Sequence, residues 1–420
     1  MKVLVVGGGA REHALCHSLS NSPRVSEVFC APGNAGIAAV ASCIPISSTD
    51  VRRLLEFAQE RSVELTVIGP EASLAEGIVD TFRSAGLAVV GPTRAASMLE
   101  TSKSFAKDVM VEAGVPTAKY QVFSEKSELE AYCFEQGAPI VLKADGLASG
   151  KGVFVINDDS EMKPAIQQLF DSLGAERVVA EELLEGFEVS CIFASNGMSV
   201  VPLLPAHDYK RLKDGDEGPN TGGMGAVCPT PRIDEELQRW IEAYCAQPII
   251  DTMNKRGTPF TGFLYAGLMI NPNLPLQEGV KVLEYNTRLG DPECQAILLS
   301  LESDIVELLE WMSGANAHSP KLRWSSNTTV CVVIASDGYP ENVQKGDQIT
   351  GLELVSLVPN ITVFHASTYR DTAGMLCSGG GRTLSVVAQS GDLQEGRASV
   401  YKAVDLVQMR GRRVRRDIGV

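Results

Sequence analysis

Polar side chains that could bind a metal ion and an anion alternate along residues 282–291. Glu284, Asn286 and Arg288 lie two positions apart, so on a β-strand they would share one face. A carboxylate and an amide oxygen suit Mg²⁺, which takes few protein ligands beside substrate phosphates, and a guanidinium suits an anion. A solvated strand face is the alternative, but the apolar residues around these side chains argue against it. The segment therefore predicts a site for a divalent cation and an anionic ligand.

A second candidate segment is a glycine-rich loop between two apolar strand patterns. Lys143 ends the first pattern, and a lysine that leaves an apolar strand is costly unless an anion meets it. Glycines let backbone N–H groups approach phosphate oxygens, and lysines supply positive charge. The loop residues that could cover a phosphate group are Gly146, Gly150, Lys151 and Gly152. A surface hairpin with two solvated lysines is the alternative, and the missing Gly-Lys-Ser/Thr triplet excludes a Walker-type site.

Three further segments could complete a nucleotide site. Lys103 lies in a helical pattern over residues 95–113, where a lone lysine is usually solvated. A strand is expected at residues 178–184, whose end could present backbone groups to an adenine edge, with Glu188 placed to accept from ribose hydroxyls. An amphipathic strand with exposed acids is an equally good interpretation. Residues 218–226 contain too many glycines for a core element, which predicts a backbone shaped closely around a small ligand.

Residues 1–100 are expected to form a parallel α/β unit, because strand patterns alternate with helical ones. Gly7 and Gly9 match the first two glycines of a dinucleotide fingerprint, but Glu12 occupies the third position, where a carboxylate would repel a pyrophosphate. NAD or FAD is therefore disfavoured. A smaller anion, such as a sugar monophosphate on the amides of Gly8 and Gly9, remains open, as does a tight turn without a ligand.

The composition limits the class of protein. The chain has 420 residues, 21% of them charged and 44% hydrophobic, which suits a globular protein of several domains. A net charge of −15 argues against nucleic acid or an anionic membrane as a partner. The ten cysteines have no ligand spacing, so neither a disulfide framework nor a zinc site is indicated. Without a signal peptide or an apolar run that could span a bilayer, we expect a cytoplasmic protein.

The region from residue 322 to residue 420 carries fewer signals for chemistry. Strand patterns and a helix at residues 393–407 predict a small α+β domain. A glycine turn at residues 379–381 places Arg382 at a basic tip, and a purely structural turn is one interpretation; the family resemblance described below implies the other, in which Arg382 faces a substrate phosphate. The basic run at residues 410–416 is expected to be a solvated strand or tail.

Five segments, in this order along the chain, resemble the phosphoribosylamine–glycine ligases, also called glycinamide ribonucleotide synthetases. The resemblance extends over residues 1 to about 419. The segments are residues 7–13, 69–71, 143–153, 218–226 and 284–291. The resemblance implies an α/β architecture with an N-terminal parallel-sheet domain at 1–102, an ATP-grasp core at 103–315 with a mobile small lobe at about 118–188, and a C-terminal domain at 322–420. It also implies that ATP, glycine and 5-phosphoribosylamine give glycinamide ribonucleotide, ADP and phosphate, the second step of de novo purine biosynthesis.

The resemblance implies roles for individual residues as well. ATP would be bound by Lys103, Lys143, Gly146, Gly150, Lys151, Gly152, Glu181, Glu182, Leu184 and Glu188, and Mg²⁺ or Mn²⁺ by Glu284 and Asn286. The two other substrates would be bound by Gly8, Gly9, Glu71, Gly222, Gly223 and Asp291, and the catalytic residues would be Arg288 and Asp208. The implied partners are small molecules, for a monomer that binds neither nucleic acid nor membranes.

The chain departs from the family pattern at three places. His207 stands where glutamine is usual and Tyr209 where histidine is usual, so neither is given a catalytic role. Residues 262–270 lack the carboxylate that many ATP-grasp enzymes place one strand before the metal site. Val420 stands where the family usually continues with an aromatic residue, which should affect the terminal strand rather than the chemistry.

Three other functions remain open on the sequence alone. One is a different ATP-grasp ligase, such as a carboxylase subunit or an amino-acid ligase. Another is a nicotinamide-dependent oxidoreductase. The third is a non-catalytic nucleotide-binding module, which the presence of Lys143, Glu284 and Arg288 disfavours.

Overall fold

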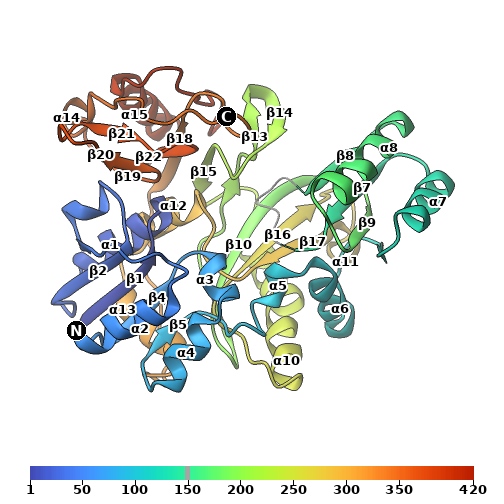
Figure 1. Cartoon of the computed structure of the whole chain (residues 1–420), viewed down its shortest axis with the longest axis horizontal. Helices are drawn as coiled ribbons and strands as arrows, with labels where there is room; N and C mark the ends of the chain where they lie inside the picture. Colours follow the sequence, from blue (N-terminus) through green and yellow to red (C-terminus); the bar gives the residue numbers. More distant parts are fainter. Residues whose placement is uncertain (147–151) are drawn as a thin grey trace.

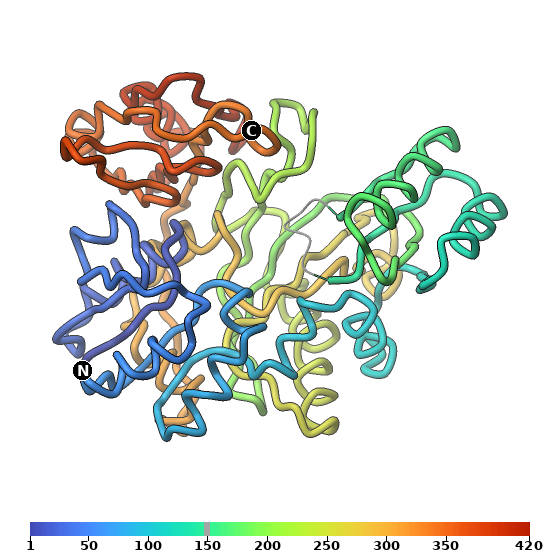
Figure 2. The backbone as a smooth tube through the Cα atoms, in the orientation of Figure 1, coloured from blue at the N-terminus to red at the C-terminus, as the bar shows by residue number. Residues whose placement is uncertain are grey.

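The computed structural model describes residues 1–146 and 152–420, so the predictions for Gly150 and Lys151 lie outside the described residues. The described chain forms an N-terminal sheet, a small lobe, a central sheet and a C-terminal sheet (Figure 1). The backbone trace in Figure 2 shows the small lobe, at residues 120–182, projecting to one side of the other three. The predicted α/β architecture is confirmed.

The N-terminal sheet is parallel, as predicted, with the strand order β3-β2-β1-β4-β5. Its strands are β1 (Lys2–Gly7), β2 (Glu27–Pro32), β3 (Ser42–Cys43), β4 (Leu65–Ile68) and β5 (Val89–Val90). Its helices are α1 (Ala10–Ser20), α2 (Val51–Glu60), α3 (Glu71–Ala75) and α4 (Ile78–Ser84). Parallel strands end at the same edge, so the turns after β1 and β4 bring Gly8 and Glu71 to one side of the sheet.

The small lobe is an antiparallel sheet with the order β6-β9-β7-β8. It consists of β6 (Tyr120–Phe123), β7 (Ile140–Ala144), β8 (Val153–Ile156), β9 (Val178–Glu182), α7 (Lys126–Gln136) and α8 (Asp159–Gln167). Leu129, Leu142 and Ile166 belong to the apolar cluster between the sheet and its helices. The strand expected to reach residue 184 ends at Glu182, so the next two residues lie beyond the sheet ladder.

The central sheet is antiparallel, with the order β11-β10-β16-β17. Its strands are β10 (Phe187–Asn196), β11 (Val200–Pro202), β16 (Thr261–Ile270) and β17 (Val280–Asn286). The helices nearby in sequence are α9 (Glu235–Ile241), α10 (Gln247–Lys255), α11 (Leu276–Gly279), α12 (Glu293–Ser300) and α13 (Ile305–Ser313). Because β17 ends at Asn286, the expectation that Arg288 continues the same strand face is wrong, and a loop carries this side chain.

The helix expected over residues 95–113 is broken at Ser102. It divides into α5 (Met98–Thr101) and α6 (Lys103–Ala113). Ser102 has an extended backbone, and its side chain accepts a hydrogen bond from the Phe105 N–H at 3.2 Å, which caps α6. Lys103 is therefore the first residue of a new helix, and the break orients it differently from a residue in the middle of a continuous helix.

The C-terminal sheet has the order β12-β15-β18-β22-β19. It combines β12 (His207–Asp208) and β15 (Gly225–Cys228) with β18 (Thr328–Ala335), β19 (Ile361–His365) and β22 (Arg382–Ser390). The remaining elements here are β13 (Arg211–Lys213), β14 (Glu217–Asn220), α14 (Leu352–Val355), β20 (Thr368–Arg370), β21 (Leu376–Ser378) and α15 (Leu393–Leu406). β12 and β15 thus belong to the same sheet as β18, β19 and β22, whereas β13 and β14 between them form a separate two-stranded sheet. The domain boundaries at 102, 315 and 322 stay a prediction.

Two expectations from composition can be compared with the described residues. The ten cysteines are all free thiols, most of them buried. Among the helices of the described ranges, none is both long and apolar enough to cross a bilayer.

A close backbone contact joins the N-terminal sheet to the central sheet. Gly262 in β16 has a φ of +106°, and a Cβ there would stand 3.0 Å from the Cα atom of Gly91, just after β5. Thr261 Oγ1 donates to the Gly91 carbonyl oxygen at 2.8 Å, and Arg83 Nη2 donates to Thr261 Oγ1 at 2.5 Å. The position of one sheet against the other therefore depends on a glycine at this point.

Gly262→Ala is expected to lower the free energy of unfolding by about 1–3 kcal/mol, because the new methyl group overpacks this contact. Gly257→Ala is the matched control, since Gly257 also has a positive φ (+75°) but a Cβ there would meet nothing within 4 Å. Denaturant unfolding of both variants measures the difference. Equal losses would show that the contact with Gly91 contributes nothing.

Candidate active site

A cavity of about 1190 Å³ lies between the four sheets. Its walls bring together most of the predicted site residues: Gly8, Gly9, Glu71, Lys103, Lys143, Gly146, Gly152, Glu181, Glu182, Leu184, Glu188, Asp208, Gly222, Glu284, Asn286, Arg288 and Asp291. Gly223 is not on the wall itself but lies behind Asp208. Residues more than 280 positions apart in sequence thus face one space, and Lys143 and Glu284 face it together.

Glu284 and Asn286 reach the cavity because of a β-bulge in β17. Gly267 on β16 is opposite Glu284, whereas the residue after Gly267 is opposite Val282, so Leu283 is the extra residue. The bulge interrupts the regular alternation of side chains and turns the end of β17 toward the cavity. Sequence alternation alone predicts the shared face of Glu284 and Asn286 but not the bulge.

Three lysines surround the Glu284 carboxylate. Burial acts against its charge, but Lys210, Lys143 and Lys103 lower the pKa of Glu284 below its ordinary value. The Lys210 ammonium is 3.9 Å from Glu284 Oε1. An ionised carboxylate beside the Asn286 amide is a donor set that fits Mg²⁺ or Mn²⁺. Within the described ranges no group of three or more His, Cys, Asp or Glu residues could hold a metal ion.

Glu181 is a buried carboxylate between two lysines. Its Oε2 atom is 3.0 Å from the ammonium of Lys143 and 3.2 Å from that of Lys107, which also donates to Thr117 Oγ1 at 2.7 Å. Burial, opposed by the charge of Glu181, lowers the pKa of Lys107 to about 8. The carboxylate therefore holds two cations in position at the small-lobe side of the cavity.

This pairing changes the expected role of Glu181. Its backbone lies within the sheet between β6 and β7, and its Oε2 atom contacts both lysines, whereas its Oε1 atom has no hydrogen-bond partner among the described residues. β9 ends one residue later, at Glu182. Leu183 and Leu184 follow beyond the ladder and also line the cavity.

Arg288 is held by two carboxylates. Its Nε atom donates to Glu71 Oε2 at 2.9 Å, and its Nη2 atom is 3.0 Å from Glu100 Oε1. Burial acts to lower the pKa of Arg288, but Glu100 and Glu71 raise it above its ordinary value, so the guanidinium stays charged. The N–H and hydroxyl of Thr287 both donate to Glu100, at 2.7 and 2.9 Å. The loop after β17 is thereby tied to α5 and α3.

The start of α1 is already capped by a side chain of the chain itself. The Gly9 N–H donates to Glu12 Oε2 at 2.6 Å, and Arg11 Nε donates to Glu12 Oε1 at 2.7 Å. The expectation that the Gly9 amide is free to bind an anion is therefore wrong. Arg11 also lines the cavity, so a cation next to Gly8 is available at this end.

Asp208 is a buried carboxyl group at the opposite end of β12 from His207. Its Oδ1 atom has no hydrogen-bond partner among the described residues. Burial, followed by the nearby charge of Glu293, raises the pKa of Asp208 well above its ordinary value. Gly223, with a φ of +106°, lies against it, and a Cβ at this position would stand 2.6 Å from Asp208 Oδ1. A cationic ligand group at this point would stabilise the ionised form of Asp208.

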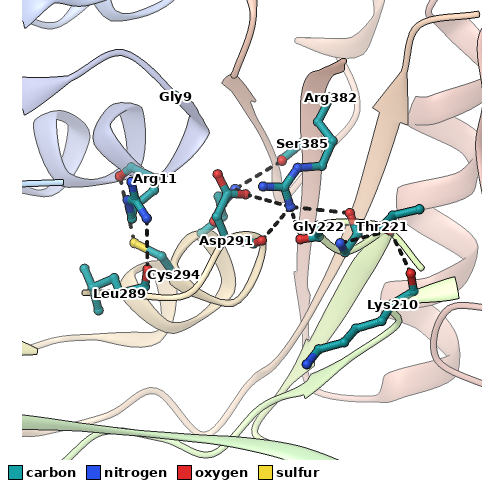
Figure 3. Close-up of polar contacts among 12 residues, drawn as sticks. Gly9, Arg11, Lys210, Thr221, Gly222, Leu289, Asp291, Cys294, Arg382 and Ser385 are labelled. Atoms are coloured by element: carbon teal, nitrogen blue, oxygen red, sulfur yellow. Dashed lines mark hydrogen bonds and ion pairs between the residues drawn. The ribbon is translucent and has the colours of Figure 1, made fainter. Parts of the chain in front are cut away.

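Arg382, the first residue of β22, brings the C-terminal sheet to the cavity. Figure 3 shows its side chain between Asp291 and Gly222. Its Nη1 atom donates to the carbonyl oxygens of both residues and is 3.4 Å from Asp291 Oδ1. Burial opposes the charge of Asp291, but Arg382 and Arg11 lower the pKa of this carboxyl group. Gln295 Nε2 donates to Asp291 Oδ1 at 2.9 Å, so the carboxylate is fixed from two sides.

Several cavity residues were not identified from the sequence. They are Arg11, Glu100, Lys107, Lys210 and Glu293. Lys107 carried a usable signal, because it follows Lys103 by four positions and shares its helix face. Lys210 carried a weaker one, two residues after Asp208. The other three are charged residues in ordinary helical segments, where only the tertiary structure distinguishes them.

The fold and the site together define a class. A small antiparallel lobe with lysines faces a central antiparallel sheet with a carboxylate and an amide, and both adjoin a parallel N-terminal sheet. This is the arrangement of an ATP-grasp enzyme, in which a nucleotide lies between the two lobes.

Comparisons with known proteins identify the family. Models described as phosphoribosylglycinamide synthetase match residues 1–100 (N domain), 101–294 (ATP-grasp A domain) and 329–420 (C domain). A phosphoribosylamine–glycine ligase of Streptomyces coelicolor is 48% identical over 100% of this chain and 98% of its own, and one of Caldanaerobacter subterraneus is 42% identical over 100% and 99%. The chain belongs to the phosphoribosylamine–glycine ligase family.

Solved structures agree with this assignment. The crystal structure of phosphoribosylamine–glycine ligase from Thermotoga maritima superposes with a TM-score of 0.84 at 32% identity and covers 100% of both chains. The biotin carboxylase domain of 2-oxoglutarate carboxylase from Hydrogenobacter thermophilus gives a TM-score of 0.73 at 16% identity, covering 98% of this chain and 91% of its own. The second likeness concerns the fold alone.

The lowered pKa of Lys107 predicts a pH dependence of stability. The ordinary value is 10.5 and the folded value about 8, so between these pH values the unfolded chain binds more protons and this group makes stability rise with pH. Lys107→Met removes the contribution. The free energy of unfolding of the unmodified protein, relative to the variant, should therefore increase from pH 8 to pH 10, by at most about 1.4 kcal/mol per pH unit.

Denaturant unfolding of both proteins at several pH values measures this trend. Lys163→Met is the matched control, because Lys163 is exposed on α8 and its replacement should give no such trend. A difference between the Lys107 variant and the unmodified protein that stays constant with pH would contradict the prediction.

Proposed function

We propose that this protein uses ATP to join glycine to 5-phosphoribosylamine, giving glycinamide ribonucleotide, ADP and phosphate in the second step of de novo purine biosynthesis. The observation that carries the proposal is that the lysines of α6 and the small lobe and the oxygen ligands of β17 line one cavity. Membership of the phosphoribosylamine–glycine ligase family supports it.

In this proposal ATP lies between the small lobe and the central sheet. Its adenine ring meets the backbone from Glu182 to Leu184, and its ribose meets Glu188. The residues proposed to contact its phosphates are Lys103, Lys143, Gly146 and Gly152, together with Gly150 and Lys151. Lys143 is already paired with Glu181, and the Lys103 ammonium donates to the Gly146 carbonyl oxygen at 3.0 Å, so both lose little freedom when a triphosphate binds and their charge is preorganised.

Glu284 and Asn286 would hold a Mg²⁺ or Mn²⁺ ion. When bound, the ion supplies positive charge to the phosphate oxygens as negative charge develops on them. Lys210 keeps Glu284 ionised, since its charge lowers the pKa of that carboxyl group in spite of burial.

The reaction must activate the carboxylate of glycine, because a resonance-stabilised carboxylate does not react with an amine at a useful rate. A carboxylate oxygen attacks the terminal phosphorus of ATP, which forms glycyl phosphate and releases ADP. The amine of 5-phosphoribosylamine then attacks the carbonyl carbon, and phosphate and a proton leave. Arg288, held by Glu71 and Glu100, would stabilise the transferring phosphoryl group, and one such charge is worth about 2.7–4 kcal/mol of barrier.

The acceptor substrates are proposed to occupy the other end of the cavity. The glycine ammonium group would meet Asp208, whose buried Oδ1 atom has no hydrogen-bond partner in the described part of the chain, beside the backbone of Gly222 and Gly223. The phosphate of 5-phosphoribosylamine would lie near Gly8 and Arg11. Glu71 and Asp291 would contact its ribose or amine. Enclosure matters because water would hydrolyse a mixed anhydride.

The proposal also concerns the location, oligomeric state and partners of the enzyme. We propose a cytoplasmic monomer whose partners are small molecules. The support is that the proposed substrates are small molecules and that the net charge of −15 disfavours polyanionic partners.

The direct test is ADP release with freshly prepared 5-phosphoribosylamine. We expect ADP only when ATP, Mg²⁺, glycine and the amine are all present, with a product whose mass is that of glycinamide ribonucleotide. Reactions that lack one component are the controls. ADP release that depends on bicarbonate or another carboxylic acid instead of glycine would refute the proposal.

Glu284→Gln should raise the Mg²⁺ concentration needed for half-maximal activity by at least about tenfold, because a neutral amide is a weaker ligand than a carboxylate. Glu278→Gln is the matched control, since Glu278 is exposed on α11 close to the start of the same strand. Activity titrated with Mg²⁺ gives the comparison. If the Glu284 variant titrates like the unmodified enzyme, the metal assignment is wrong.

A further inference from the structure

The last residues of the chain, called the tail from residue 415 onward, run along the hairpin formed by β13 and β14, which borders the cavity. Figure 1 shows the C-terminus next to β13 and β14. The sequence predicted a solvated tail for residues 410–416, and this expectation is wrong for Arg415, whose side chain is 1% exposed. A buried arginine has a large desolvation cost, which its hydrogen bonds and ion pairs must offset.

Arg415 and Asp417 connect the tail to the hairpin. Arg415 Nη1 donates to the Arg211 carbonyl oxygen at 3.1 Å and to Asp216 Oδ1 at 2.8 Å. Its Nε and Nη2 atoms donate to the two oxygens of Asp417, both at 2.7 Å. Asp417 Oδ2 also accepts from the Gly215 N–H at 2.8 Å. Both β13 and the tip of the hairpin are therefore bound to the tail.

The tail itself is anchored to the C-terminal sheet and its helix. The hydroxyl of Tyr401 on α15 donates to the Arg415 carbonyl oxygen at 2.9 Å and accepts from the Ile418 N–H at 3.0 Å. Ile418 is fully buried and packs against Gly225, where a Cβ would stand 3.0 Å from its side chain. The tail is thus a fixed support rather than a flexible end.

Tyr209 connects this support to the cavity. Its hydroxyl accepts from the Gly419 N–H at 3.0 Å, and the Arg415 guanidinium lies 5.0 Å from the centre of its ring. Its backbone N–H donates to the Gly225 carbonyl oxygen at 3.0 Å, and its carbonyl oxygen accepts from the Met224 N–H at 2.8 Å. Both the side chain and the backbone of Tyr209 are therefore fixed.

The two neighbours of Tyr209 in sequence are cavity residues. In an extended chain, successive side chains point to opposite sides. Because Tyr209 points toward the tail, its neighbours Asp208 and Lys210 point toward the cavity, and both line its wall. The Lys210 carbonyl oxygen also accepts from the N–H and the hydroxyl of Thr221, both at 2.8 Å, which joins Lys210 to the glycine run next to Arg382 (Figure 3). Movement of Tyr209 would displace all of these groups.

We propose that Arg415, Asp417, Ile418 and Gly419 form a positioning clamp for the glycine-binding end of the active site, acting through Tyr209 on its neighbour Asp208. The inference rests on the proposed function, in which Asp208 meets the glycine ammonium group. The clamp residues touch no substrate, so they are positioning residues. Loss of the clamp should weaken glycine binding and leave the small-lobe side of the nucleotide site, around Lys107 and Glu181, unchanged.

Arg415→Met is the first test. We expect the KM for glycine to rise by between about tenfold and 100-fold, as for other small displacements of positioning groups. The dissociation constant for ATP, measured without glycine, should change by a clearly smaller factor, because only Lys210 connects Tyr209 to Glu188 and Glu284. Arg415→Lys should recover part of the glycine affinity, because it keeps the charge but not the forked geometry.

Arg416→Met is the matched control. Arg416 is the next residue, its guanidinium is half-exposed, and it pairs with Asp405 on α15 rather than with the hairpin. Its backbone N–H, which donates to Asp214 Oδ1 at 2.7 Å, is unaffected by the substitution. We expect a glycine KM equal to that of the unmodified enzyme. If Arg415→Met does not fold, Tyr209→Phe removes only the hydroxyl contact with Gly419 and should raise the glycine KM in the same direction.

A second measurement separates the clamp from the proposed reaction. Hydrogen exchange of the backbone amides at residues 208–224 should become faster in Arg415→Met and remain unchanged in Arg416→Met. Absence of any glycine-dependent ADP release by the unmodified protein would refute the proposed function, while the exchange experiment would still report on the clamp. Unchanged exchange and an unchanged glycine KM in a folded Arg415 variant would overturn the clamp, as would an equal loss of ATP and glycine affinity.

Discussion

Buried positive charge facing one cavity is the constraint on which the rest of this structure depends. A site that binds polyanions needs cations that are partly desolvated, and such cations are unstable without nearby carboxylates. Several of them are paired here: Glu181 lies between Lys107 and Lys143, and Glu71 and Glu100 hold Arg288. The carboxylates both stabilise the fold and orient the cations, so binding a phosphate requires little reorganisation.

The paired groups come from separate parts of the fold, and local irregularities direct them to the cavity. The break at Ser102 makes Lys103 the first residue of α6, and the bulge at Leu283 turns the end of β17. The C-terminal sheet contributes Arg382, which is bound to Asp291 and to the glycine run at Gly222. An active site built in this way exists only when all the sheets are assembled, which explains why no single segment carries it.

The two ends of the cavity differ in their electrostatics, and this difference fits two kinds of ligand. At the small-lobe side lysines outnumber the carboxylates they contact, which suits phosphates. At the other end Asp208 and Glu293 are neighbouring buried acids, and burial with their mutual repulsion raises the pKa of Asp208. An ammonium group there relieves the repulsion. Glycine has both a carboxylate and an ammonium group, so it matches a cavity with cations at one side and buried acids at the other.

The sequence alone predicted the fold class and part of the cavity wall, because strand periodicity, glycine runs and chemically unusual side chains are local properties, and the resemblance to the ligase family added further wall residues. Glu284 and Asn286 were predictable from spacing, and Lys143 from the cost of a lysine at the end of an apolar strand. Only the tertiary structure decided which charges meet. Glu12 accepts from the Gly9 amide, Glu181 pairs with Lys107 and Lys143, and Arg415 is buried against Tyr209. The physical reason is that pairing and burial depend on distances in space. The residues that surround a charged side chain in the sequence do not show which distant residue it will meet.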